Sequence, residues 1–203
     1  MSVDYALERE ALDAGYRSVC GVDEAGAGPL MGPVYAAAVI LPEDCAIDGL
    51  DDSKKLTEKK REALFEVICG TAVSYAVAFA TEREIDEINI LNARMLAMQR
   101  AIDALGVSAD FALIDGNRSR GITLPCRTVV HGDARSVSIA AASVLAKVSR
   151  DRFVVDVLDR EYPQYAFAKH KGYGTKLHYQ MLDLYGPSPV HRMSFLKKWE
   201  AKR

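Results

Sequence analysis

The sequence predicts an α/β fold in which helices flank a mixed β-sheet. Short apolar runs typical of buried strands fall between residues 18 and 130 of the 203-residue chain, and a stretch with helical period lies among them. From residue 138 onward the pattern is mainly helical. Strands followed by helices, with a helix between strands, indicate a layered α/β domain. Since no repeat or linker interrupts the chain, we expect one domain over residues 1–203.

Each expected element has a local signal. Thr57 is a suitable N-cap for the second helix, which carries Glu58 in its first turn. Apolar residues at spacings of 4, 3, 4 and 3 mark a strong amphipathic helix, whose methionines are interpreted as core: Leu91, Met95, Met98, Ile102 and Leu105. The expected helices are 3–14, 58–69, about 91–105, 138–161 and 175–184, and the expected strands are 18–23, 34–41, 74–80, 111–115 and 122–130.

Composition limits the class of protein. With 49% hydrophobic and 27% charged residues, the chain is typical of folded globular proteins. No apolar run approaches the ~20 residues that cross a bilayer. The four cysteines include no CxxC pair, and the acidic N-terminus lacks a signal-peptide core. We therefore expect a cytoplasmic protein with reduced thiols and no membrane contact.

Charge is distributed unevenly along the chain. Residues 141–203 hold 12 Lys and Arg against 6 Asp and Glu, whereas residues 1–140 hold 14 against 22. A basic third beside an acidic remainder suits a protein that combines a carboxylate site with a surface for a polyanion. A solvated helical surface would give the same balance, so charge alone does not decide.

Acidic residues stand at the ends of three expected strands. Asp23 and Glu24 end the first, Asp115 ends FALID, and Asp133 follows the next. Neighbouring strand residues point to opposite faces, so Asp23 and Glu24 can serve one site only if the chain turns at once. The glycines that follow permit this turn. If the first strand and FALID are adjacent, Asp23 and Asp115 meet at one sheet end.

Carboxylates gathered in one place repel each other unless a multivalent cation offsets their charge. All-oxygen ligands select hard ions such as Mg²⁺ or Mn²⁺. Two such ions about 4 Å apart are a common apparatus for in-line phosphodiester cleavage. Taken singly, each acid fits a helix cap or a turn at least as well.

Six sequence blocks occur in one order and at consistent spacing. The blocks are VDEAG-x-GPLMGPV, DSKKL (52–56), IDGN (114–117), HGDARSVSIAAASVLAKVSRD (131–151), KHKGYGT (169–175) and HRMSF (191–195). Together they resemble bacterial ribonuclease HII over roughly residues 16–195. The resemblance implies an RNase H-like mixed β-sheet flanked by helices, with a basic helical C-terminal extension from about residue 138 to 203.

The resemblance implies a type 2 ribonuclease H that serves in ribonucleotide excision repair. Such an enzyme cleaves RNA in RNA–DNA hybrids and at single ribonucleotides in duplex DNA. It cuts 5′ of the ribonucleotide and leaves 3′-hydroxyl and 5′-phosphate ends. The family's four carboxylates, which hold two Mg²⁺ or Mn²⁺ ions, match Asp23, Glu24, Asp115 and Asp133. Asp151 stays outside this set and is expected to form an ion pair or a helix-side hydrogen bond.

The resemblance also assigns substrate-binding residues. The family's Gly-Arg-Gly motif, which approaches nucleic acid chiefly through backbone groups, falls on Gly26, Ala27 and Gly28, and the tyrosine of its GYGT block falls on Tyr173. A flat ring beside the deoxyribose at an RNA–DNA junction would sense a missing 2′-oxygen. A partly buried loop tyrosine is the structural alternative.

Ala27 stands where the family has arginine. Loss of a guanidinium removes up to five donors and a charge that could pair with phosphate or with a carboxylate. We therefore expect metal binding to be intact but substrate binding or junction specificity to be weaker. The alternative reading is a catalytically weakened module of the same fold that binds RNA–DNA hybrid.

Other expectations concern the surface and partners. Lys54 and Lys55 are interpreted as phosphate contacts, with a solvated basic pair as the alternative, and His191 and Arg192 as packing near the site. Ribonuclease HIII shares the fold but has an additional N-terminal domain, for which the about 15–20 residues before the first strand are too few. A monomer is the default, and nothing after Phe195 supports contact with a sliding clamp.

Overall fold

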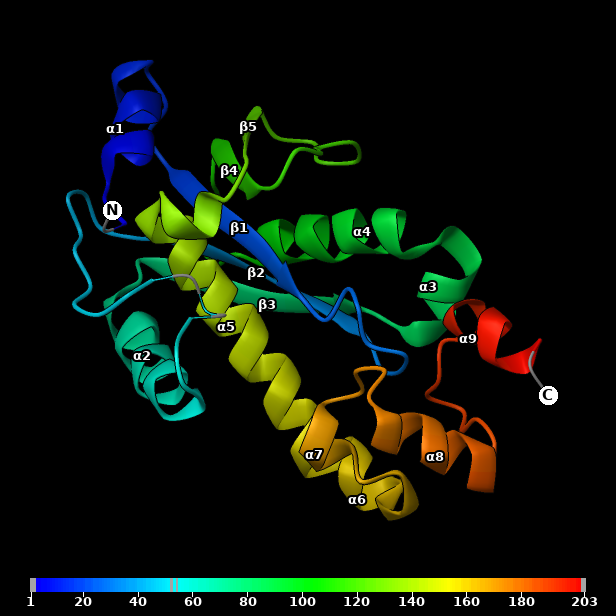
Figure 1. The fold of residues 1–203 in the computed structure, drawn as a ribbon. Helices are drawn as coiled ribbons and strands as arrows, with labels where there is room; N and C mark the ends of the chain where they lie inside the picture. The colour runs from blue at the N-terminus through cyan, green and yellow to red at the C-terminus, as the bar shows by residue number, and fades with distance from the viewer. Residues whose placement is uncertain (1–2, 52, 54, 202–203) are drawn as a thin grey trace.

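The computed structural model describes residues 3–51, 53 and 55–201. The strands are β1 (Val19–Ala25), β2 (Val34–Ile40), β3 (Ser74–Ala80), β4 (Phe111–Asp115) and β5 (Cys126–Val129). They form one sheet in the order β3-β2-β1-β4-β5 (Figure 1). β2 pairs antiparallel with β1 and β3, whereas β4 pairs parallel with β1 and β5. The sheet is therefore mixed, as the sequence predicts.

The helices are α1 (Ala6–Asp13), α2 (Glu58–Thr71), α3 (Glu82–Ile88), α4 (Ile90–Asp103), α5 (Val137–Phe153), α6 (Asp159–Glu161), α7 (Phe167–His170), α8 (Lys176–Tyr185) and α9 (Met193–Glu200). A π-helical segment joins α5 to α6, and short 3-10 turns precede α5 and α7. No helix in the described part of the chain is both long and apolar enough to cross a membrane.

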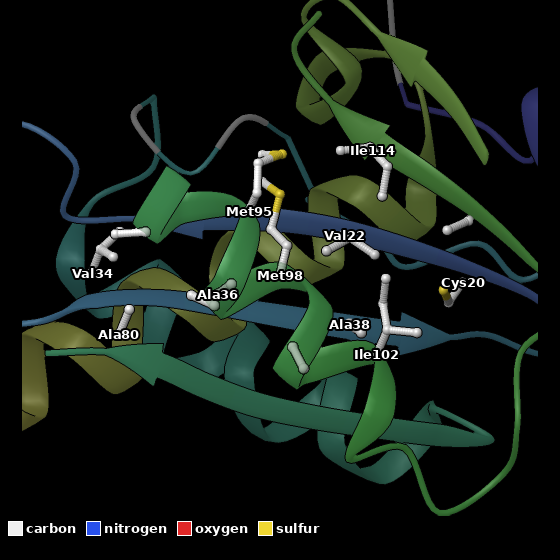
Figure 2. Close-up of a cluster of buried hydrophobic side chains, with 14 of the residues drawn as sticks. Cys20, Val22, Val34, Ala36, Ala38, Ala80, Met95, Met98, Ile102 and Ile114 are labelled. Carbon is white, nitrogen blue, oxygen red and sulfur yellow. The ribbon is translucent and has the colours of Figure 1, made fainter. Parts of the chain in front are cut away.

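Helices cover both faces of the sheet. α4 packs on one face, and α5, flanked by α2, packs on the other (Figure 1). Figure 2 shows Met95 and Met98 of α4 among the apolar side chains of the sheet, so these methionines are core residues, as predicted. On the opposite face, Gly21 lets β1 approach α5 closely, because a Cβ there would overlap the backbone of Ser138.

The C-terminal helices enclose the loop between β1 and β2. Two residues of this loop, Leu30 and Met31, are buried in one cluster with Phe167, Leu182 and Leu196. Within the described residues, the chain from α5 onward adds no strand to the sheet. The position of the loop is thus set by segments far away in the sequence.

Some elements differ from the sequence predictions. β1 continues through Ala25, so Asp23 and Glu24 lie inside the strand and the chain turns only at Gly26. The short helices α3, α7 and α9 were not predicted. α3 has a clear signal, a capping box formed by Thr81 and Glu84.

Candidate active site

Asp23 lies in β1 on the face that α5 covers. Its side chain is buried and accepts hydrogen bonds from the hydroxyl of Ser143 and from the backbone N–H of Glu24, the latter at 2.7 Å. Burial raises the pKa of the Asp23 carboxyl well above its usual value, and the charges of Glu24 and Asp115 raise it further. The hydroxyls of Ser53 and Ser143 are 2.7 Å apart, which links the DSKKL block to this carboxylate.

Asp115 stands beside Asp23 at the end of β4. β1 and β4 run parallel, and the last pair in their register immediately precedes the two aspartates. The adjacency of these strands is therefore confirmed. Asp115 Oδ1 accepts the backbone N–H of Gly132 at 2.8 Å and makes a longer contact, 3.4 Å, with that of Asp133. These bonds bring the buried Asp133 to the same sheet edge.

Glu24 points to the opposite face of β1, because side chains alternate along a strand. There its Oε1 lies 2.5 Å from Nη2 of Arg94 in α4. Arg94 also lines a small pocket together with Asp115, Asn117 and Arg118. The condition set for a shared face, a turn immediately after Asp23, is not met, because the chain turns only at Gly26. Glu24 therefore approaches the sheet edge from the other side of the strand.

The acids do not form a closed metal site. Within the described residues, no group of three or more His, Cys, Asp or Glu side chains is arranged to hold a metal ion. The donor chemistry nevertheless fits a hard divalent cation, since Asp23, Asp115 and Asp133 supply only oxygen ligands. The repulsion that contributes to the raised pKa of Asp23 is also what a cation would relieve.

The loop after β1 is shaped around two fully buried arginines, Arg150 and Arg192. Gly26 has a φ of 89°, and a Cβ there would collide with Nε of Arg150, so only glycine fits. Burial and the nearby charge of Arg150 lower the pKa of Arg192 to about 9, which leaves it cationic at neutral pH. Arg192 donates to four carbonyl oxygens of the loop: Gly26 (2.7 Å), Ala27 (3.1 Å), Pro29 (2.8 Å) and Gly32 (2.8 Å).

Tyr173 lies beside Gly28. A Cβ added at Gly28 would be 3.8 Å from Cε1 of Tyr173, an ordinary contact and the only one within 4 Å in the described structure. The side chain of Tyr173 is 44% exposed, and Nζ of Lys147 is 5.9 Å from the centre of its ring. The structure thus brings together the glycine block and the tyrosine that the resemblance assigns to substrate binding.

Three further positions named in the sequence analysis are the two lysines of DSKKL and Asp151. Lys54 lies outside the described residues. Lys55 is exposed, and its Nζ is 3.1 Å from the carboxylate of Asp51. Asp151 forms an ion pair at 2.8 Å with Lys147, one helical turn earlier, as predicted.

Comparison with known proteins decides the family. A family model described as Ribonuclease HII matches residues 20–198. The chain belongs to the ribonuclease HII family. It is 52% identical to the ribonuclease HII of Caldicellulosiruptor bescii over 193 residues, covering 95% of this chain and 93% of that protein. It is 58% identical to that of Dechloromonas aromatica over 177 residues, covering 87% of this chain and 90% of that protein.

Solved structures agree with this assignment. The ribonuclease H2 from Pyrococcus horikoshii matches with a TM-score of 0.69 at 26% identity, covering 92% of this chain and 98% of that one. A ribonuclease HIII named Bst-RNase HIII, solved with Mn²⁺, matches with a TM-score of 0.70 at 18% identity over 95% of this chain and 71% of that one, which shows a shared fold. This ribonuclease HII is therefore a nuclease of the type 2 ribonuclease H class.

Sequence reasoning missed part of what surrounds the candidate site of this ribonuclease HII. It interprets Arg192 as packing near the site, which agrees with the burial of Arg192 against the glycine loop, but it does not give the four hydrogen bonds of Arg192 or any role for Arg150. Nothing in a local pattern shows that an arginine is fully buried. Arg94 lies outside every block, and its partner Glu24 is distant in the sequence. Only the three-dimensional fold brings these pairs together.

Proposed function

We propose that this ribonuclease HII cleaves RNA in RNA–DNA hybrids and at single ribonucleotides in duplex DNA. It cuts 5′ of the ribonucleotide and leaves a 3′-hydroxyl and a 5′-phosphate. The observation that carries the proposal is the pair of aspartates, Asp23 and Asp115, at the ends of parallel strands, with Asp133 tied to the same edge. Family membership supports the substrate class.

Asp23, Glu24, Asp115 and Asp133 would hold divalent cations, Mg²⁺ or Mn²⁺. When bound, two such ions supply activation of the attacking water and neutralisation of charge on the departing 3′-oxygen. Hydrogen bonds from the protein orient the carboxylates that would bind these ions. Ser143 donates to the Asp23 carboxylate, and backbone N–H groups fix Asp115 Oδ1.

Arg94 holds the carboxylate of Glu24 on the α4 side of β1. Its positive charge offsets part of the negative charge at the sheet edge, so the acids can lie close together before a cation binds. Because Arg94 and Asp115 line the same pocket, a duplex phosphate at this edge would meet a cationic side chain as well as the carboxylates.

Backbone N–H groups of the glycine loop would contact the substrate. Arg192 fixes the carbonyls of Gly26 and Ala27, and the described peptide bonds include no cis bond. In a trans peptide the carbonyl and the following N–H point in opposite directions. The N–H groups of Ala27 and Gly28 therefore point away from Arg192, where they can donate to a phosphate or a 2′-hydroxyl. Tyr173 is proposed to contact the deoxyribose beside the junction.

We also propose that the enzyme acts as a cytoplasmic monomer of one domain. The one-domain reading is supported by the sheet of the described residues, on whose two faces α4 and α5 pack. A PCNA:RNase HII complex from Archaeoglobus fulgidus, whose enzyme has 23% identity and a TM-score of 0.69, makes a clamp contact worth testing. Light scattering of the purified protein measures its oligomeric state, and the same measurement with a sliding clamp present shows whether the two proteins form a complex.

A cleavage assay tests the proposed function. A hybrid and a duplex with one ribonucleotide are incubated with the enzyme in Mg²⁺, Mn²⁺ or EDTA. We expect metal-dependent cleavage that Asp115→Asn lowers by about a thousandfold or more. Asp156→Asn, an exposed acid outside the site, is the matched control. Tight binding of hybrid without cleavage in any metal would instead support the weakened binding module.

A further inference from the structure

Three buried histidines from separate segments meet beneath Tyr173. His170, His178 and His191 all have exposed fractions below 8%. The rings of His170 and His178 stack with centroids 4.4 Å apart, and those of His178 and His191 lie 5.2 Å apart. Phe167 packs against all three rings. The sequence places His191 near the site as a packing residue, but nothing in a local pattern brings it together with His170 and His178.

The hydrogen bonds fix the proton positions on two of these rings. The backbone N–H of Ser188 donates to His191 Nδ1 at 2.9 Å, so His191 carries its proton on Nε2. His191 Nε2 is 3.0 Å from His178 Nε2, which must therefore accept. The proton of His178 is then on Nδ1, which donates to the carbonyl oxygen of Tyr173 at 3.0 Å. One direction of donation satisfies every bond.

This series of hydrogen bonds from Ser188 through His191 and His178 to Tyr173 requires that both imidazole rings are neutral. A protonated imidazole donates from both nitrogens. Protonation of His178 would place an N–H at its Nε2 opposite the Nε2–H of His191, and protonation of His191 would place an N–H at its Nδ1 opposite the backbone N–H of Ser188. Burial, together with the neighbouring histidines, lowers the pKa of His178 and of His191 to about 4. The rings are thus neutral at neutral pH.

The series of hydrogen bonds ends at the backbone carbonyl of Tyr173. The carbonyl of Tyr173 also accepts the N–H of Thr175 at 2.8 Å, and its N–H donates to the carbonyl of His170 at 2.9 Å. The next residue after His191 is Arg192, which holds the carbonyls of the glycine loop. Residues 191 and 192 therefore connect to both segments that face the substrate.

We propose that His178 and His191 are positioning residues that set the orientation of Tyr173 relative to Gly28, and so the discrimination between substrates. The proposal rests on the proposed function, in which Tyr173 contacts the deoxyribose beside the ribonucleotide. The histidines touch no substrate and act through the carbonyl of Tyr173. Loss of these histidines shifts the Tyr173 ring. The shift affects cleavage most for the substrate in which the ring contacts a deoxyribose without a 2′-oxygen.

The test compares two variants of His178. His178→Phe fills the space but removes both ring nitrogens, whereas His178→Asn keeps an amide nitrogen at the position of Nδ1. The readout is the ratio of kcat/KM for the single-ribonucleotide duplex to that for the hybrid. We expect His178→Phe to change this ratio by about tenfold or more, and His178→Asn to stay near wild type. Tyr165→Phe, which removes the bond from Tyr165 Oη to the carbonyl of Gly186 in the same cluster, is the matched control and should leave the ratio unchanged.

A second background shows whether the effect passes through Tyr173. In Tyr173→Ala, the further change His178→Phe should leave the ratio unaltered. A folded His178→Phe with the wild-type ratio, or the same change of ratio in both backgrounds, would overturn the proposal.

Two measurements without substrate separate this proposal from the proposed function. Nitrogen-15 spectra should show the Nδ1–H form of His178, and amide exchange at residues 171–175 should be faster in His178→Phe than in wild type. The other tautomer, or unchanged exchange, contradicts the positioning role even if the enzyme cleaves. Failure of the wild-type enzyme to cleave either substrate, with both measurements as expected, contradicts only the proposed function and the reading role of Tyr173.

Discussion

The two positions that flank Ala27 differ in whether the fold itself requires glycine. At Gly26 the protein itself requires glycine, because φ is positive and Arg150 occupies the space of a Cβ. At Gly28 the protein leaves room, since a Cβ would meet only the edge of Tyr173 at an ordinary distance. The fold therefore does not require glycine at position 28, which leaves room for the substrate contact proposed above.

This contrast predicts opposite behaviour of two alanine variants. Gly26→Ala should lower the free energy of unfolding by about 2–4 kcal/mol, from backbone strain and overpacking against Arg150. Gly28→Ala should change it by less than about 0.5 kcal/mol, as surface changes usually do, yet raise KM for the duplex. Denaturant unfolding and steady-state kinetics measure both effects. Equal stability of the two variants would contradict the assignment.

At position 27 we expect a substitution to increase substrate affinity rather than lower it. Its backbone carbonyl is held by Arg192, and its side chain is only partly buried, so a longer side chain can extend toward solvent. Ala27→Arg should tighten binding of a duplex with one ribonucleotide by about tenfold at low salt, since one more guanidinium can pair with phosphate. The difference should shrink as salt rises. Equal affinity of the two proteins at every salt concentration would show that position 27 does not matter.

At the scale of elements, the glycine loop depends on the C-terminal part of the chain. Arg192 replaces the backbone partners that an irregular buried loop lacks, by donating to four of its carbonyls. A single guanidinium can do so because its donors form a planar fork, which an ammonium group does not offer.

Arg192→Lys should therefore destabilise the protein although the charge is kept. We expect a loss of about 3 kcal/mol in the free energy of unfolding, because several carbonyls lose their donor in a buried place. Arg83→Lys, on an exposed helix face where Arg83 pairs with Glu87, is the matched control and should change stability by less than about 0.5 kcal/mol. Denaturant unfolding of the two variants decides, and similar losses in both would contradict the special position of Arg192.

Sequence reasoning located the regular elements but not the connections between them. The strands at β2, β3 and β4 and the helices α2, α4 and α8 follow from apolar period and caps, which are local. The end of β1 was placed too early, because DEA continues a strand only when neighbouring strands pair with it. The pairing of Glu24 with Arg94 and the histidine chain depend on contacts between distant segments, which no local pattern reports.

At the scale of the whole molecule, the two parts of the structure respond to different conditions. The sheet edge carries repelling acids, whereas the helices that enclose the glycine loop contain neutral buried imidazoles. Protonation of the imidazoles would weaken the C-terminal packing and, through Arg192 and Tyr173, the segments that face the substrate. Stability and substrate reading are therefore expected to fail together as the pH approaches 4, where these rings take up protons in the folded protein.

The pH dependence of stability follows from the lowered pKa of two histidines. His178 and His191 have an ordinary pKa of 6.5 and a folded pKa of about 4, so between these values the unfolded chain binds more protons than the folded one. Their contribution to stability is complete above pH 6.5 and is lost as the pH falls toward 4. Each histidine adds a slope of up to about 1.4 kcal/mol per pH unit. Denaturant unfolding between pH 5 and 6.5 should show stability rising with pH.

The double variant His178→Asn/His191→Gln is the reference for this measurement. It keeps polar groups at both positions but cannot titrate, so its slope between pH 5 and 6.5 should be smaller than that of wild type. Asp23, whose raised pKa acts with the opposite sign, is present in both proteins and cancels in the difference. The pKa of Glu84, lowered to about 2 by Arg100, affects stability only at lower pH. Equal slopes in the two proteins would show that these histidines are not buried as neutral rings.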